Sequence, residues 1–234
     1  ANLVAVSLSQ GGSESGDVHV YDASTGKPLA EVIPHVNSGT AGGSVAWRQD
    51  DQGFYYTRYP HVGERPAADL DFYQQVWFHK LGTAVSTDTY SLGKDFPRIA
   101  EILLSTSRDG RYILAQMANG DGGEFAHYLL SPSGQWTQVT RMADSVTRAT
   151  FGGNDSLWLV SHQGSPMGKI LRMPLAKPSL AGAQMVIPES KFAVEEVIAT
   201  PHRLYVVDQA GGPMQVRVFD EKGGSKGLIP LALS

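Results

Sequence analysis

The chain has 234 residues and a formal net charge of −4, and 41% of its residues are hydrophobic while 18% are charged. This composition predicts a globular fold with a buried core and not a disordered chain. Without a basic stripe that could neutralise phosphates, we expect no nucleic-acid partner. No apolar run approaches the ~20 residues that a membrane-spanning helix needs, so we also expect no membrane partner.

The sequence contains no cysteine. Disulfides and cysteine-ligated zinc or iron–sulfur centres are therefore excluded. A chain of this kind fits a bacterial protein of the cytoplasm or of the periplasm, because both compartments contain many cysteine-free proteins.

The first predicted elements are three short strands with alternating apolar residues, at residues 2–8, 17–21 and 30–33. They resemble the second, third and fourth strands of a unit that recurs later in the chain. Its first strand is absent, and the sequence starts at Ala1 without an initiator methionine. We interpret the two chain ends as cuts within a longer array, or as halves that complete one another.

The second unit is the clearest copy. Strands at residues 44–47 and 54–57 are separated by a turn with aspartates and a glycine, and further strands follow at residues 75–81 and 88–92. Three more units repeat this order. Their strands are predicted at residues 101–105, 112–116, 124–130 and 136–140, at residues 147–151, 157–160, 169–173 and 184–187, and at residues 194–199, 204–207, 215–219 and 227–231.

The spacing between third strands identifies the architecture. Tyr21, Phe78, Leu129, Met173 and Phe219 mark these strands, at intervals of 57, 51, 44 and 46 residues. Such intervals are typical of propeller blades, each of which must stack on a neighbour to bury its faces. We therefore predict an all-β fold, a β-propeller of about five four-stranded antiparallel blades forming one domain over residues 1–234. The blades are expected at about residues 1–36, 44–93, 99–141, 146–188 and 193–232.

The second unit also carries a specific sequence pattern: SVAW at residues 44–47, GFYYTRYP at residues 53–60 and QVWFHKLGT at residues 75–83. This pattern resembles the propeller domain of the prolyl oligopeptidase family of serine peptidases. Weaker matches follow at residues 107–112 and 168–172. The resemblance covers essentially the whole chain, as a fragment or as a reduced five-bladed form.

The resemblance implies a propeller that caps an active site, filters substrates by size and contacts the peptide. In the family the propeller has seven blades and is joined to an α/β-hydrolase domain, which would be the partner of this chain. An arginine that often holds a substrate carbonyl in the family has no counterpart at residues 117–120, so recognition of proline peptides in the usual way is not expected.

Three tyrosines are the candidate substrate contacts. Within the family an aromatic residue of this hairpin lines the substrate pocket; Tyr55 is the best match, and Tyr56 and Tyr59 are further candidates. Alternating aromatic residues also pack between blades, so both interpretations stay open. The acidic insert at residues 61–71 is either a contact element or a solvated loop.

Catalytic chemistry is not expected in the chain itself. The one G-x-S-x-G pattern, at residues 223–227, has no helix after it and no later aspartate or histidine, so it predicts a hairpin turn. The histidines form no metal-ligand spacing, and residues 119–124 lack the carboxylate ladder of a calcium loop, so no metal or cofactor is predicted. The seven histidines are His19, His35, His61, His79, His127, His162 and His202.

These patterns predict a non-catalytic, substrate-gating propeller of a prolyl-oligopeptidase-like serine peptidase. The alternative is a stand-alone five-bladed propeller that acts as a binding or scaffold module.

Overall fold

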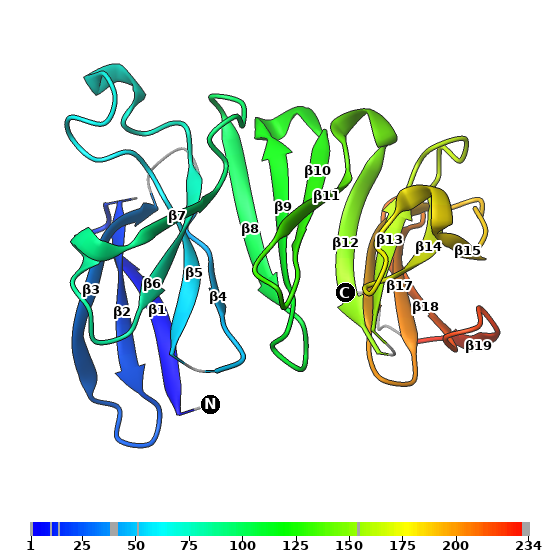
Figure 1. The fold of residues 1–234 in the computed structure, drawn as a ribbon. Coiled ribbons are helices and arrows are strands. Elements are labelled where there is room, and N and C mark those ends of the chain that lie inside the picture. The colour runs from blue at the N-terminus through cyan, green and yellow to red at the C-terminus, as the bar shows by residue number, and fades with distance from the viewer. Residues whose placement is uncertain are drawn as a thin grey trace. The chain divides into compact units, whose positions relative to one another are not determined.

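The computed structural model describes residues 2–9, 11–13, 15–37, 42–50, 52–153 and 155–230. Within these ranges the chain forms nineteen β-strands and five short 3₁₀ helices, and no α-helix (Figure 1). The described part also contains no helix that is long and apolar enough to span a membrane. The last predicted strand extends to residue 231, which lies outside the described residues.

The strands form five antiparallel sheets, each built from strands that are consecutive in the chain. The first sheet contains β1 (Leu3–Ser9), β2 (Gly16–Asp22) and β3 (Pro28–Asn37). The second contains β4 (Val45–Trp47), β5 (Gly53–Arg58), β6 (Gln75–Lys80) and β7 (Thr89–Leu92). The third contains β8 (Ala100–Thr106), β9 (Ile113–Asn119), β10 (Phe125–Leu130) and β11 (Trp136–Thr140).

The fourth sheet contains β12 (Val146–Gly152), β13 (Ser156–Ser161), β14 (Lys169–Pro174) and β15 (Gln184–Ile187). The fifth contains β16 (Ala193–Ala199), β17 (Leu204–Gln209), β18 (Met214–Phe219) and β19 (Ser225–Leu228). The 3₁₀ helices lie in connections: η1 (Ala67–Asp69), η2 (Val85–Thr87), η3 (Gly120–Gly122), η4 (Met142–Asp144) and η5 (Leu180–Gly182).

The predicted all-β class, with successive four-stranded units and a three-stranded first unit, is confirmed. The third strand of the first sheet is longer than predicted, because β3 runs on to Asn37. Register shifts against β2 and a positive φ of 57° at His35 allow this strand to continue past its regular pairing.

The chain divides into two compact units. Unit 1 comprises Ala1–Gly122 and Leu129–Trp136, and unit 2 comprises Gly123–Tyr128 and Thr137–Ser234. The extent of a single propeller domain over residues 1–234 stays a prediction.

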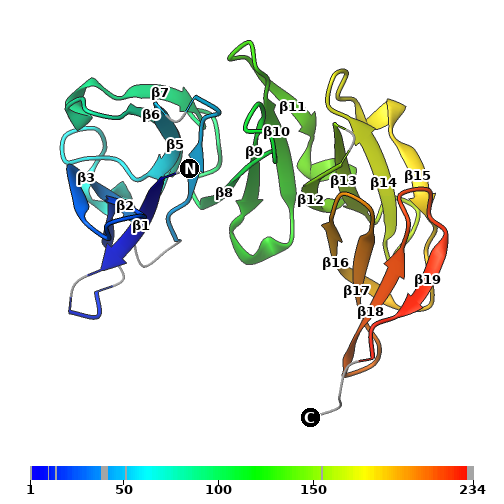
Figure 2. The same cartoon turned by 90° about the horizontal axis from the view of Figure 1, so that it is seen from below.

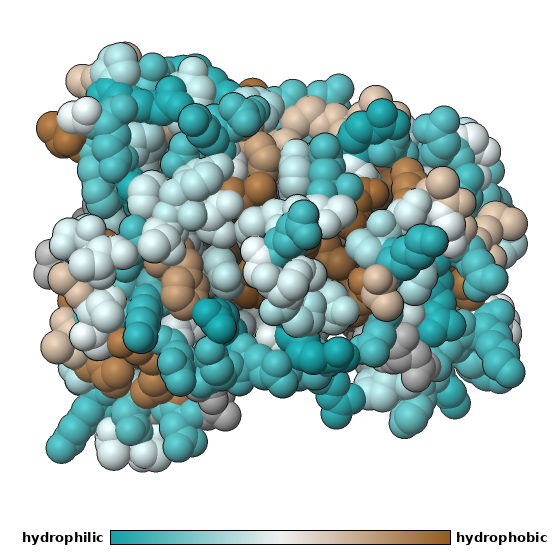
Figure 3. Space-filling model, viewed as in Figure 1, coloured by the Kyte–Doolittle hydropathy of each residue, from teal (hydrophilic) through white to brown (hydrophobic). Residues whose placement is uncertain are grey.

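Each unit has its own apolar core between neighbouring sheets. In unit 1 the first and second sheets bury a cluster that includes Ile33, Phe54 and Tyr56. In unit 2 the fourth and fifth sheets bury a cluster that includes Trp158 and Leu204, and Figure 2 shows these two sheets side by side. Apolar side chains reach the surface only as separate patches among hydrophilic ones on the face drawn in Figure 3. The cores therefore arise from stacked sheet faces, as expected for repeated β units.

Polar side chains join the second sheet to β8, the first strand of the third sheet. Gln74 is fully buried; its Nε2 donates to the Gly42 carbonyl at 3.1 Å, and its Oε1 accepts from the Ile102 amide at 2.7 Å. The Ser44 hydroxyl accepts from the Leu104 amide at 2.8 Å. These bonds satisfy backbone groups that no strand ladder pairs, because β4 and β8 belong to different sheets.

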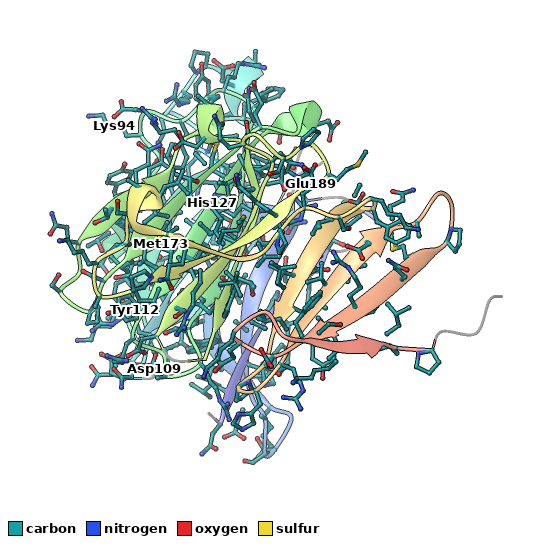
Figure 4. All side chains as sticks on the ribbon, turned by 90° about the vertical axis from the view of Figure 1, so that its right-hand side faces the viewer. Lys94, Asp109, Tyr112, His127, Met173 and Glu189 are labelled. Atoms are coloured by element: carbon teal, nitrogen blue, oxygen red, sulfur yellow. The ribbon has the colours of Figure 1, made fainter. Side chains whose placement is uncertain are left out.

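Antiparallel order gives the second and third sheets two distinct ends. We call the end at which β4 joins β5, β8 joins β9 and β10 joins β11 the turn end. The opposite end, which carries residues 59–74 and 93–99, is the loop end. Figure 4 shows Asp109, in the β8–β9 turn, and Lys94, in the connection before β8, at these opposite ends.

Candidate functional site

The three candidate tyrosines come from one short segment but point to three different environments. Phe54 and Tyr56 face the core against the first sheet, whereas Tyr55 projects from the other face of β5 toward Trp136. Tyr59 follows the end of the strand, at the loop end. Successive side chains of a strand point to opposite faces, so the sequence neighbours cannot share one site. Substrate contact by each of these tyrosines stays a prediction.

Tyr56 belongs to a buried polar cluster. Its hydroxyl donates to Asp88 Oδ2 at 2.8 Å, and His79 Nδ1 lies 2.7 Å from Asp88 Oδ1. The side chains of His79 and Asp88 are 0% and 2% exposed. Burial, and then the hydrogen bond to the Asp88 carboxylate, raise the pKa of Tyr56 far above its usual range. The cluster therefore anchors the residues that precede β7 to β5 and β6.

Tyr59 lines a pocket at the loop end, although only 1% of its surface is exposed. This loop-end pocket has a volume of about 240 Å³. Its walls come from the 59–74 segment, from the chain leading into β8, and from the residues after β9. The lining residues are Tyr59, Asp71, Phe72, Arg98, Ile99, Ala100, Glu101, Gly120 and Asp121.

The acidic insert is anchored to the second sheet by a buried arginine. Arg58 is 5% exposed; its guanidinium donates to both carboxylate oxygens of Glu64, at 2.7 and 3.0 Å, and lies 3.9 Å from the centroid of the Trp77 ring. The hydrogen bonds from Arg58 are the main cause that lowers the pKa of Glu64 to about 2. Glu64 also accepts from the His61 amide at 2.9 Å. The start of the insert is therefore held to the second sheet by hydrogen bonds.

A second arginine holds the far part of the insert. Arg98 Nε donates to Asp69 Oδ1 at 2.8 Å, its Nη2 donates to the Ala68 carbonyl at 3.0 Å, and its guanidinium lies 3.5 Å from the centroid of the Phe72 ring. The Tyr73 amide in turn donates to the Arg98 carbonyl at 2.8 Å. Two walls of the loop-end pocket are therefore joined directly to each other.

Negative charge dominates the rim of this pocket. Glu101 lies at the start of β8 and Asp121 in η3, and both line the pocket. Partial burial, and then repulsion by Asp121, raise the pKa of Glu101 above its ordinary value. Among the described residues that line the pocket, the one cation is Arg98, which is already engaged by Asp69. A cationic group entering the pocket would therefore relieve repulsion between the two carboxylates.

Tyr55 lies in a different pocket, at the turn end of the second and third sheets. This turn-end pocket has a volume of about 460 Å³. The Tyr55 ring packs against Phe78 and Trp136, with centroid distances of 5.0 and 6.3 Å. Burial is the main cause that raises the pKa of Tyr55. The lining residues are Arg48, Gln49, Asp50, Tyr55, Gly110, Arg111, Ile113, Leu130, Ser131, Pro132, Ser133 and Gly134.

The G-x-S-x-G pattern forms a hairpin turn. Asp220 accepts hydrogen bonds from the backbone amides of Lys222 and Gly224, at 3.0 and 2.8 Å, and Ser225 starts strand β19. An esterase-type nucleophile requires a strand-to-helix elbow instead. The described residues also contain no group of three or more histidine, aspartate or glutamate side chains placed to hold a metal ion.

Sequence reasoning missed the side chains that shape both pockets. Arg98 precedes β8, Glu101 lies in β8 and Asp121 follows β9, and no local motif connects them. Period-2 alternation does carry a signal for His79, because it lies on the same face of β6 as Trp77, which packs against the apolar core of unit 1. Its buried partner Asp88 lies nine residues later, beyond the reach of such a pattern.

Comparison with known proteins identifies the family. Residues 1–233 match the family described as "Prolyl oligopeptidase, N-terminal beta-propeller domain". The chain belongs to this family. It is 29% identical over 197 residues to a prolyl endopeptidase of Elizabethkingia meningoseptica, covering 82% of this chain and 27% of that protein. A second prolyl endopeptidase, from Elizabethkingia miricola, is 28% identical over 193 residues, covering 80% of this chain and 26% of that protein.

Solved structures share the fold. A prolyl endopeptidase structure, from a study of inter-domain dynamics in two such enzymes, superposes with a TM-score of 0.85 at 21% identity, covering 98% of this chain and 34% of that one. Oligopeptidase B from Leishmania major superposes with a TM-score of 0.74 at 17% identity, covering 97% of this chain and 31% of that one. The predicted propeller fold and family resemblance are confirmed. The chain spans about a quarter of the length of the two curated relatives above.

Proposed function

We propose that this chain is the non-catalytic, substrate-gating propeller of a longer serine peptidase, in which an α/β-hydrolase domain carries the catalysis. Family membership supports this proposal. A second support is that the chain covers only about a quarter of the length of the two prolyl endopeptidases that it resembles. The chain's own G-x-S-x-G pattern is a hairpin turn, which supports the absence of a nucleophile in the described residues.

The observation that carries the gating role is the loop-end pocket. Its walls are ordered by Arg58 and Arg98, whose hydrogen bonds hold the 59–74 segment against the sheet and against the next connection. A peptide side chain fits a volume of about 240 Å³ with aromatic and aliphatic walls. The carboxylates of Glu101 and Asp121 favour a peptide that carries a positive charge beside an apolar residue.

The first experiment tests catalysis. The purified chain is incubated with proline-containing chromogenic peptides, with and without a serine-directed phosphonate. We expect no turnover above the buffer rate. Turnover that the phosphonate abolishes would overturn the assignment as a non-catalytic domain.

The second experiment tests peptide contact by titration calorimetry with two acetylated, amidated peptides, Ala-Leu-Lys-Ala and Ala-Leu-Glu-Ala. We expect the lysine peptide to bind at least fivefold more tightly, and the variants Glu101→Gln and Asp121→Asn to remove most of this preference. Asp144→Asn makes the same charge change at a residue that lines neither pocket and serves as the control. Failure of both peptides to bind, or equal binding to all variants, would contradict a peptide role for this pocket.

A further inference from the structure

The turn-end pocket is separate from the loop-end pocket and is not explained by the gating proposal. Three turns form it: residues 48–50 between β4 and β5, residues 110–111 between β8 and β9, and residues 131–134 between β10 and β11. Gly110 allows two of these turns to meet, because a Cβ at this position would lie 2.9 Å from the Cα of Gln49. The pocket therefore exists only where the second and third sheets pack together.

Rigid apolar groups form one side of the pocket. Ile113 and Leu130 are 2% and 6% exposed, so each presents only a small part of its surface. The Tyr55 ring is held between Phe78 and Trp136, and the Trp136 indole donates to the Ser91 hydroxyl at 2.8 Å. This wall does not need to rearrange to accept an aliphatic or aromatic side chain.

Hydrogen-bond donors with positive charge form the other side. Among the described lining residues, two carry a guanidinium group, Arg48 and Arg111, and one carries a carboxylate, Asp50. Arg48 contacts Asp50 through Nη2 at 2.9 Å, and both side chains are more than a third exposed. A guanidinium has five N–H donors, and an exposed ion pair of this kind contributes little to stability. Arg48 therefore keeps donors for an incoming anion. Arg111 pairs with Asp109, which does not line the pocket.

The Tyr55 hydroxyl adds a neutral donor. Within the described residues no hydrogen-bond partner is found for this hydroxyl, although the ring itself is fixed by its aromatic neighbours. Because burial raises the pKa of Tyr55, the phenol stays protonated at neutral pH and keeps its proton to donate. Arginine and phenol donors beside an apolar wall match the chemistry of a carboxylate next to a hydrophobic group.

We propose that the turn-end pocket binds a carboxylate that has an apolar side chain beside it, as at the C-terminus of a peptide or in a small acylated amino acid. Arg48 pairs with the carboxylate, the Tyr55 hydroxyl donates to it, and the apolar group packs on Tyr55, Ile113 and Leu130. This site lies at the end of the sheets opposite the loop-end pocket. The two pockets are lined by opposite charges, so we expect an anionic ligand in the turn-end pocket and a cationic ligand in the loop-end pocket.

Titration calorimetry on the full chain tests the proposal with three probes: acetyl-Ala-Ala-Leu with a free carboxylate, the same peptide with an amidated C-terminus, and N-acetylleucine. We expect the free acid to bind about tenfold more tightly than the amide, since the charge-assisted contact is lost in the amide. If N-acetylleucine binds as tightly as the free-acid peptide, a small acylated amino acid is sufficient as the ligand. Tighter binding of the peptide identifies a peptide C-terminus.

Three substitutions and one control assign the contacts. We expect Arg48→Gln to weaken binding of the free acid about tenfold and Tyr55→Phe about threefold, each with little change for the amide. Asp50→Asn removes the competing carboxylate and is expected to strengthen binding two- to threefold. Arg141→Gln is the matched control, because Arg141 also pairs with a nearby aspartate, Asp144, and lines neither pocket.

Two results would overturn the proposal. One is equal affinity for the free acid and the amide. The other is wild-type affinity in both Arg48→Gln and Tyr55→Phe. The Tyr55→Phe variant keeps the packed ring, so its result remains interpretable even if Arg48→Gln lowers the melting temperature of the chain.

Discussion

Replacing Asp88 by asparagine keeps the size of the side chain but removes the charge that joins Tyr56 to His79. Both hydrogen bonds of the Asp88 carboxylate lie in a site where the His79 and Asp88 side chains are 0% and 2% exposed. Hydrogen bonds to a charged group contribute about 1.5–3 kcal/mol, and leaving a buried donor without a partner adds a desolvation cost. An asparagine can still serve one of the two neighbours, so we expect the free energy of unfolding to fall by about 2–3 kcal/mol.

Equilibrium unfolding in urea, followed by tryptophan fluorescence, measures this change. Where the two compact units unfold in separate transitions, the transition of unit 1 is expected to shift, because the cluster lies within Ala1–Gly122. Asp50→Asn is the control, since Asp50 is exposed and its loss is expected to cost less than about 0.5 kcal/mol. An effect of Asp88→Asn no larger than that of the control would refute the view that this cluster anchors the chain before β7.

Three further predictions concern pH, the insert and a close backbone approach. Burial lowers the pKa of His127 from 6.5 to about 4, so between these pH values the unfolded chain binds a proton that the folded chain does not. The free energy of unfolding should therefore fall by roughly 3 kcal/mol as the pH is lowered from 6.5 to 4. His127→Gln should flatten this part of the stability curve, and an unchanged curve in urea titrations across this range would contradict the prediction. Glu64→Gln should speed hydrogen exchange at the amide of His61, measured by mass spectrometry, because a neutral side chain pairs less strongly with the buried Arg58 guanidinium; unchanged exchange would count against the anchor. Gly53→Ala should cost about 1–3 kcal/mol in urea unfolding, because a Cβ would overlap the backbone carbonyl oxygen of His79 and lie 2.7 Å from the Phe78 ring, whereas a cost below 0.5 kcal/mol would show that the backbone of β6 shifts to make room.

Local information was sufficient for the architecture. Second strands such as β5 and β13 are apolar runs, third strands such as β18 alternate, and turn residues recur between them. These features depend on neighbours within one hairpin, and they predicted the strands and their order. The repeat spacing and the pattern at residues 53–60 then identified the propeller and its family. These signals are readable in the sequence because strand periodicity and turn chemistry act over only a few residues.

Tertiary structure decided which of these residues share a site. Tyr55, Tyr56 and Tyr59 are close in sequence, yet they lie in the turn-end pocket, the buried Asp88 cluster and the loop-end pocket. Each pocket is assembled from connections of different sheets, and its charge depends on side chains that are tens of residues apart in sequence. The sequence by itself determined the blades and the family, whereas the packing of one sheet against the next determined the sites, because contact between separate sheets leaves no periodic trace in the chain.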